Sequence, residues 1–495
     1  MNFKRITGVA LQVCTALYLA VSLVLTFTVS DYYVFNRIGE FNFFFVISHW
    51  LKKCGLLLLP LAVWYKKKCC SDIAKYFLPV FVIISCCTFG SFFDITMMTE
   101  GITHEQQVQN IFASINEFMP KAANMALYFI AAALELICCA LLFVRDGWKV
   151  KAKSFIYLPL AIVALMPLNV FENFFDINSI PQDSFLRFKN FTLWHFLALA
   201  ILVGFTIGCY YVLKKFDKKK QQDFLVAGAI VLLIQYHSKD SMLLGDGYNV
   251  YNNVFAAIPL FICNIGVYVA SLSVILKKRI PYAISFFVHA AGALSVFIYF
   301  GKDEMSNYGI FCSHSILYFC LTHCLLFCLC VLPSALGHYK FKIKDCIVPL
   351  IYYCLVIVLA TVSSGLVSTY LTERGLVIGD YGAPGVDMSP PNYAFTQVNP
   401  LPIPFNYIPF TIGNYTFYLS YLIALYLVYV GLFWIFTGSY YAFLAVRRRI
   451  LRGQSQKAPQ NTGVPIPLTL SETALTDGDG LNGENTAEND EEKVG

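Results

Sequence analysis

Gly309 to Leu332 reads GIFCSHSILYFCLTHCLLFCLCVL, an apolar run with the length of a membrane-spanning helix. It carries His314 near its first end. An ionisable side chain is costly in hydrocarbon, so an intramembrane histidine is by default a candidate functional residue. The alternative is a packing histidine satisfied by a neighbouring group, and this stretch alone leaves both interpretations open.

The composition of the whole chain is typical of a multi-pass membrane protein. Of its 495 residues, 58% are apolar and 13% are charged, and the mean hydropathy is +0.62. These values lie outside the range of soluble globular domains. The apolar runs are continuous over about 20 residues and do not alternate, which favours helices over a β-barrel. The 17 cysteines lie mostly inside these runs and are expected to be small packing residues.

The apolar runs predict an all-α fold of about twelve membrane-spanning helices. The expected spans are 6–29, 43–65, 75–95, 123–144, 154–174, 193–213, 223–238, 254–276, 281–300, 309–333, 346–370 and 416–446. The seventh is short enough to be tilted or re-entrant, and the twelfth is long. The first begins after Lys4 and Arg5 and is expected to be a retained helix, not a cleaved signal peptide.

The basic residues predict the orientation of these helices. Most of the 36 lysines and arginines fall in alternate loops, beginning with the one before the first span. Lys52 and Lys53 are assigned to the opposite side, at the mouth of the second helix. Because cytoplasmic loops carry the excess of lysine and arginine, both termini are predicted to be cytoplasmic. This topology explains the basic loops without a nucleic-acid partner.

Three regions are expected along the chain. Residues 1–180 form an N-terminal five-helix membrane region, residues 190–450 a seven-helix membrane domain, and residues 453–495 a disordered acidic cytoplasmic tail. Short matches six helices apart, such as Asn124-Met-Ala-Leu-Tyr-Phe with His314-Ser-Ile-Leu-Tyr-Phe, suggest a degenerate parallel tandem repeat. The repeat and a chance match of apolar segments both remain open.

Polar residues from several elements are predicted to lie in the outer half of the membrane. They are His195, His237, Asp240, Cys263, Asn264, His314, Asn392 and Tyr393. A thiol becomes a nucleophile when a nearby imidazole accepts its proton, and an Asn or Asp can orient that imidazole. In a lipid-facing cleft the matching electrophile is an acyl ester. The sequence does not show that Cys263 and His314 touch.

From about Asn190 to Phe443 the chain resembles the YwaF family of bacterial integral membrane proteins, which is related to vertebrate transmembrane protein 164, a phospholipid acyltransferase. The features that carry the resemblance occur in the family's order. They are Phe191-Thr-Leu-Trp-His195, the basic loop Lys214–Lys220, Ile258-Pro-Leu-Phe-Ile-Cys263, Ser313-His314 and Pro391-Asn-Tyr-Ala-Phe395. Phe261 and Ser315 stand where the family has a polar residue and a glycine.

The resemblance implies roles for two residues. Cys263 matches the proposed acyl-accepting cysteine and His314 the catalytic histidine, with the other polar residues as substrate-binding or supporting groups. Membrane phospholipids are the expected partners, without cofactor, metal or nucleic acid. A bacterial plasma membrane is the preferred location, or an endomembrane if the host is eukaryotic.

Three functions remain open from the sequence. The first is an acyltransferase that acts on glycerophospholipids through Cys263 and His314. The second is a transporter or lipid translocator, which twelve helices and a parallel repeat would fit. Against it, charges near the bilayer midplane are scarce: Glu135 is the main one, alongside His289. The third is a non-catalytic scaffold or sensor.

Overall fold

The computed structural model describes residues 3–28, 43–87, 121–167, 181, 184–240, 258–298, 314–373, 393–396 and 406–457. Contacts divide the chain into two units, residues 1–437 and 438–495. The first unit contains the membrane helices discussed below, except for the end of the last one. Of the second unit, the described part is the end of the last helix, and the predicted tail beyond residue 457 lies outside the described residues.

The N-terminal region is a group of apolar helices. Its elements are α1 (Phe3–Thr28), α3 (Phe43–Val63), α4 (Lys68–Cys87), α8 (Lys121–Asp146) and a 3-10 turn (Ala152–Tyr157) that leads into α9 (Leu158–Ala164). Pro60 lies inside α3 and Pro79 inside α4. α1 packs along α8, α3 along α4, and α4 along α8.

The remaining helices begin at residue 193. They are α11 (Leu193–Lys214), α12 (Lys218–Asp240), α14 (Ile262–Leu276), α15 (Arg279–Ile284), α16 (Ala290–Ile298), α18 (His314–Ala335), α19 (Ile347–Glu373) and α20 (Leu419–Lys457). A π-helical turn, Ser285–His289, joins α15 to α16 without a break. Short 3-10 turns cover Ile343–Cys346 and Tyr393–Phe395.

The multi-pass architecture is confirmed. In the described part of the chain, 8 helices are long and apolar enough to cross a membrane, and α15 with α16 counts as one of them. The other expected spans are occupied by α3, α9, α12 and α14, of which α9 with its preceding turn and α14 are short apolar helices. Helical segments therefore lie on all the expected spans, but only part of them have the length and composition of a complete span.

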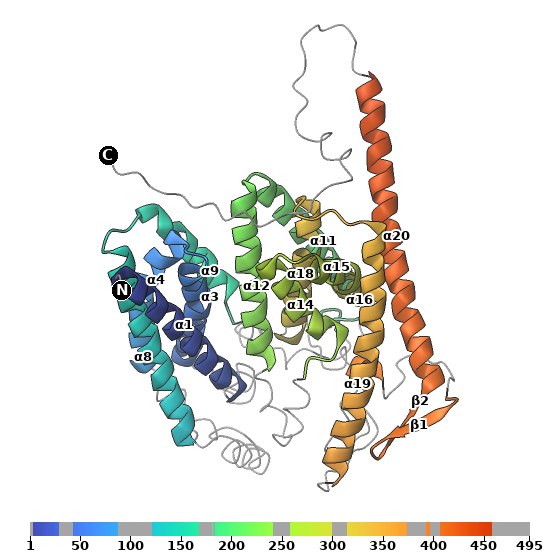
Figure 1. Ribbon diagram of the computed structural model, residues 1–495, viewed down its shortest axis with the longest axis horizontal. Coiled ribbons are helices and arrows are strands. Elements are labelled where there is room, and N and C mark those ends of the chain that lie inside the picture. Colours follow the sequence, from blue (N-terminus) through green and yellow to red (C-terminus); the bar gives the residue numbers. More distant parts are fainter. Residues whose placement is uncertain are drawn as a thin grey trace. The chain divides into compact units, whose positions relative to one another are not determined.

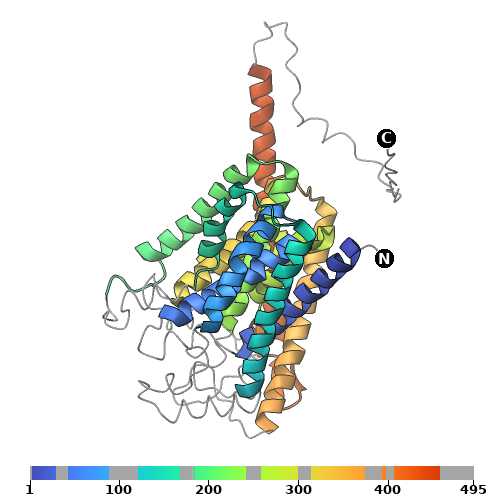
Figure 2. The ribbon, with the colours of Figure 1, turned by 90° about the vertical axis from the view of Figure 1, so that its left-hand side faces the viewer.

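Helix α12 stands between the two groups of helices. It contacts α1 and α3 on one side and α14 and α18 on the other. Figure 1 shows the N-terminal helices, in blue and teal, on one side of α12 and helices α14, α18 and α19 on the other. In Figure 2 the N-terminal group faces the viewer. The two groups therefore meet along a shared helix.

The basic loops come together at one end of this bundle, which we call the basic end. Lys67 forms a salt bridge of 2.5 Å with Asp223, and Arg145 donates a hydrogen bond of 3.1 Å to the Ala62 carbonyl. Lys218 donates to the Leu336 carbonyl, and the Tyr339 hydroxyl donates to the Lys277 carbonyl. These contacts join five of the connections on which the predicted orientation rests. Which side of the membrane this end faces stays a prediction.

Two of the differences from the expected elements have a local cause in the sequence. α14 begins at Ile262, later than expected: Pro259 disfavours helical backbone at Ile258, and the N-cap Phe261 is extended. A hairpin, β1 (Pro409–Ile412) paired with β2 (Tyr415–Tyr418), precedes α20, and its second strand covers residues 416–418, where the last span was expected to begin. Its strands are rich in β-branched and aromatic residues, and Gly413 provides the positive φ of +59° that its turn requires.

Lys52 and Lys53 also lie elsewhere than expected. They sit in the middle of α3 and not at its mouth. At a rise of about 1.5 Å per residue, Lys53 is about 15 Å from the end of α3 at Val63, roughly half of a bilayer core. The two lysines therefore belong to no loop and carry no information on the orientation of the helices. Charged residues at this depth are candidates for a functional role.

Candidate functional site

Cys263 lies in the first turn of α14. The capping residue Phe261 is extended, with φ −80° and ψ 143°, and its carbonyl accepts the first helical hydrogen bond from Ile265 at 2.9 Å. The first N–H groups of a helix have no partner within the helix, and its dipole is positive at this end. Negative charge on the Cys263 sulfur, or on an oxyanion next to it, is therefore stabilised by the backbone.

The surroundings of Cys263 come from three other helices. The thiol is half-buried and within electrostatic range of Cys330 in α18, Tyr353 in α19 and Tyr429 in α20. Tyr393, a predicted site residue, belongs to the same region: it is fully buried and meets the Phe261 ring edge-on at 6.4 Å. The structure thus places Tyr393 against the start of α14, two residues from Cys263, in an apolar region rich in tyrosines.

His289 is a histidine of this region that the sequence did not place in the site. It closes the π-helical turn and is fully buried, with Nε2 at 3.1 Å from the Tyr352 hydroxyl. Its Nδ1 is 2.7 Å from the place where a Cβ on Gly266 would stand. Gly266 follows Cys263 by one helical turn, so His289 lies on the same side of α14 as Cys263. π-turns recur at functional sites, but this one is visible only in the structure and not in the sequence.

His314 is the first residue of α18, and its side chain is not among those that the structure describes. The Tyr339–Lys277 contact makes the ends of α18 and α14 neighbours at the basic end. From those ends, helix rise puts Cys263 at about 20 Å and His314 at about 30 Å. The two residues are thus separated by about 10 Å along the bundle.

His195 is held by hydrogen bonds to the backbone on another side of the domain. Its Nδ1 accepts the Phe191 N–H at 2.8 Å, and its Nε2 is 2.7 Å from the Phe297 carbonyl. Because Nδ1 is the acceptor, the ring proton is on Nε2 and donates to that carbonyl. His195 is buried and holds the start of α11 to the end of α16.

Among the other predicted residues, those that the structure describes do not form a single cluster with Cys263. His237 in α12 pairs its Nε2 with the Tyr268 hydroxyl at 3.2 Å and faces the N-terminal helices. Asn264 is half-buried beside Cys263 in α14. The Asp240 side chain and all of Asn392 lie outside the described residues. Within the described ranges, no group of three metal-ligating side chains is found.

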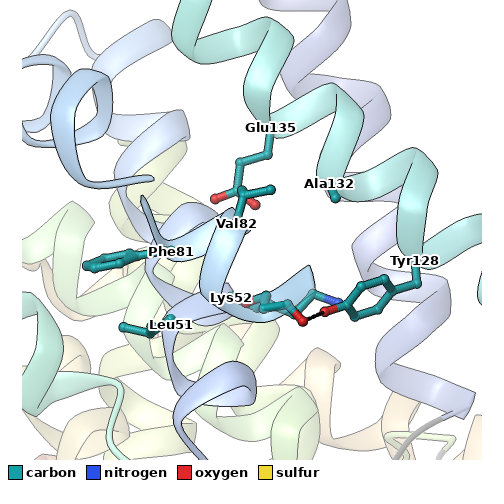
Figure 3. A pocket seen from close by; sticks show the side chains of 8 residues that line it. Leu51, Lys52, Phe81, Val82, Tyr128, Ala132 and Glu135 are labelled. Atoms are coloured by element: carbon teal, nitrogen blue, oxygen red, sulfur yellow. Dashed lines mark hydrogen bonds between the residues drawn. The ribbon is translucent and has the colours of Figure 1, made fainter. Parts of the chain in front are cut away.

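A second polar cluster lies inside the N-terminal helices. The Lys52 amine sits 3.5 Å from the centre of the Tyr128 ring, and Glu135 in α8 is 3% exposed and electrostatically coupled to Lys52. Figure 3 shows Lys52 and Glu135 on the wall of the same small pocket. A Cβ on Gly55 would collide with both the Tyr18 hydroxyl and Glu135 Oε1, so glycine permits this approach.

Comparison with known proteins identifies the second half of the chain. Residues 190–434 match the TMEM164 family. No curated protein matches the chain, and no solved structure does. The matched range contains α11 to α19, with Cys263, and most of the apolar part of α20. The N-terminal helices, with Lys52 and Glu135, precede it. Residues 190–434 of this multi-pass membrane protein are therefore a TMEM164 family domain.

Proposed function

We propose that the protein is an integral membrane acyltransferase that moves a fatty acyl chain between glycerophospholipids through a thioester on Cys263. The observation that carries the proposal is the position of this thiol at the N-terminus of α14 in a TMEM164 domain, a family associated with acyltransferase activity. The proposal keeps the kinship with YwaF proteins and a bacterial plasma membrane, or an endomembrane in a eukaryote, as its setting.

The reaction has two balanced halves. A histidine accepts the Cys263 proton, and the thiolate attacks the ester carbonyl of a phospholipid. The ester bond breaks, the lysophospholipid leaves with the proton that the histidine returns, and the acyl group stays on sulfur. The hydroxyl of a second lysophospholipid then gives its proton to the histidine and attacks the thioester, which restores the thiol. The backbone N–H groups at the start of α14 would stabilise both oxyanions.

Two histidines are candidates for the proton transfer. The family resemblance assigns the role to His314, about 10 Å further from the basic end than Cys263 by helix rise. His289 lies on the Cys263 side of α14 and is fixed by Tyr352. Separate variants of the two distinguish a base from a histidine that positions other groups.

The test uses the full chain in lipid–detergent micelles, with phosphatidylcholine that carries a labelled acyl chain and a lysophospholipid acceptor. Wild type should transfer label and retain some on the protein in a hydroxylamine-sensitive bond. Cys263→Ala should abolish both signals, whereas Cys354→Ala, at an exposed cysteine of α19, should change neither. Loss of transfer in His314→Ala or in His289→Gln identifies the base. Transfer that survives in Cys263→Ala would overturn the mechanism.

A transporter or lipid translocator is the second candidate, favoured by Lys52, Lys53 and Glu135 in the middle of α3 and α8. Buried charges at this depth mark substrate or proton pathways in transporters. Movement of a fluorescent phospholipid between the leaflets of proteoliposomes, lost in Glu135→Gln and kept in Cys263→Ala, would support it.

A further inference from the structure

The connection from α8 to α9, residues 147–157, which we call the α8–α9 loop, lies at the basic end between two apolar helices. The helix surface on each side of it is apolar and exposed: Val144 before the loop is 54% exposed and Leu160 after it 56%. In a bilayer, the exposed apolar side of a spanning helix faces the acyl chains. The loop therefore lies where the acyl chains meet the lipid head groups.

The start of the loop is held on α4 through two backbone carbonyls. Lys75 donates a hydrogen bond of 2.7 Å to the Gly147 carbonyl, and the Tyr76 hydroxyl donates one of 2.5 Å to the Trp148 carbonyl. The Trp148 ring packs on Phe143, with 4.5 Å between the ring centres, and is 74% exposed. Tryptophan is enriched at the interface between membrane and water. The structure thus fixes an indole on the outside of the bundle, at the level that suits it.

The rest of the loop is held by Asp72. Its Oδ2 accepts the Ser154 hydroxyl at 2.8 Å and the Lys151 backbone N–H at 3.3 Å. Asp72 is fully buried and forms salt bridges with Lys68 at 3.1 Å and with Lys75 at 3.6 Å. This carboxylate is directed inward and is paired within α4. A loop that is fixed before it meets a ligand loses little conformational entropy on binding.

The side chains that the loop exposes are basic and apolar. Lys149, Lys151 and Lys153 are exposed, and Ile156 is 75% exposed. Lysines at one end of a membrane protein are by themselves a sign of orientation. Here they stand beside an exposed indole and an exposed isoleucine, on a backbone that buried charges hold. Basic and apolar groups in this arrangement match a negatively charged head group and its acyl chains.

We infer that the α8–α9 loop binds an anionic phospholipid, whose phosphate lies at the three lysines. Its acyl chains lie along the exposed apolar residues of α8, the loop and α9. A zwitterionic lipid fits less well, because its own cation would stand among the amines. The site belongs to the N-terminal helices, outside the TMEM164 domain, and does not depend on acyl transfer at Cys263.

The experiment uses the full chain in lipid–detergent micelles with phosphatidylglycerol or phosphatidylcholine that carries bromine on its acyl chains. Bromine quenches tryptophan fluorescence on contact, and the difference between wild type and Trp148→Phe isolates Trp148 among the five tryptophans. Phosphatidylglycerol should quench this signal at a mole fraction at least about fivefold lower, the contribution of about one lysine near an anionic surface. Equal quenching by both lipids, which is expected if the acidic tail covers the lysines instead, would overturn the inference.

Variants then locate the site. Replacement of Lys149, Lys151 and Lys153 by Gln together should bring the two lipids within about twofold of each other. The matched control removes the same charge from exposed lysines of the α11–α12 loop, with Lys214, Lys215 and Lys219 replaced by Gln, and should keep the wild-type preference. Loss of the preference in both triple variants would overturn the inference, because the charge of the whole basic end would then select the lipid. Cys263→Ala should keep the preference, which separates this site from the proposed acyl transfer.

Discussion

Gly266 is the residue on which the placement of His289 depends. Its missing side chain leaves the space that the imidazole occupies, since a Cβ there would stand 2.7 Å from Nδ1 and 2.9 Å from Cγ of His289. Gly266→Ala should therefore push the ring away from Tyr352 and cost about 1–3 kcal/mol of stability, the usual cost of overpacking. Thermal unfolding in detergent measures it.

The matched control for this prediction is Gly204→Ala in α11, where no atom lies within 4 Å of the added Cβ. That variant should be as stable as wild type or gain up to about 1 kcal/mol from helix propensity. If both alanine variants unfold at the wild-type temperature, the close contact between Gly266 and His289 is not present.

His338, at the basic end, is expected to make the stability of the protein depend on pH. Burial, with Lys218 and Lys277 nearby, lowers the pKa of this loop histidine below its ordinary value of 6.5. The unfolded chain then binds a proton that the folded chain does not, so stability is lost as the pH falls below about 6.5. His338→Gln should show a smaller drop in unfolding temperature between pH 7.5 and pH 5.5, whereas an unchanged drop would contradict the assignment.

Among the helices, those that follow directly from the sequence are the continuous apolar runs. The run predicted at 193–213 is observed as α11, Leu193–Lys214, because an apolar segment in a bilayer must satisfy its backbone within the helix. The hairpin was missed because its strands are as apolar and aromatic as a helix start. Its formation depends on a turn at Gly413 that docks on Thr369 of α19 through the Asn414 N–H.

The candidate site was only partly predictable for a related reason. Cys263 and Tyr393 were found from local motifs, and Tyr393 packs against Phe261, two residues before Cys263. His289 stands out only because it contacts Tyr352 and Gly266, which lie on two other helices. Lys53 stands out only because it lines a cavity that α12 also lines. Lateral packing between helices has no local sequence period, so these neighbours could not be read from the chain.

Helix α14 ends in a strained residue. Lys277 adopts the left-handed conformation, with φ 56° and ψ 35°, a position that favours glycine. Lys277→Gly should relieve the strain and stabilise the protein by about 1 kcal/mol. Lys278→Gly removes the same charge at an extended residue, with φ −95° and ψ 139°, and should bring no gain. Equal unfolding temperatures for the two variants would argue against the strained end.

For the whole chain, contacts bring five of the basic connections together at the basic end. If this end is cytoplasmic, epitope tags at both termini should be protected from protease in intact cells and digested after permeabilisation. A tag inserted beside Lys189, before α11 and therefore at the opposite end, serves as the accessible control. Digestion of either terminal tag in intact cells would contradict the predicted topology.

The two lysines in the middle of α3 also constrain how the protein is made. A lysine at the centre of a helix costs about 2.5–3.5 kcal/mol on entering a bilayer from the translocon, so α3 is poorly suited to partition into lipid by itself. Its charge partner, Glu135, is synthesised only with α8. Stable insertion of α3 is therefore expected to await α8, which makes the N-terminal helices an obligate assembly unit during biogenesis.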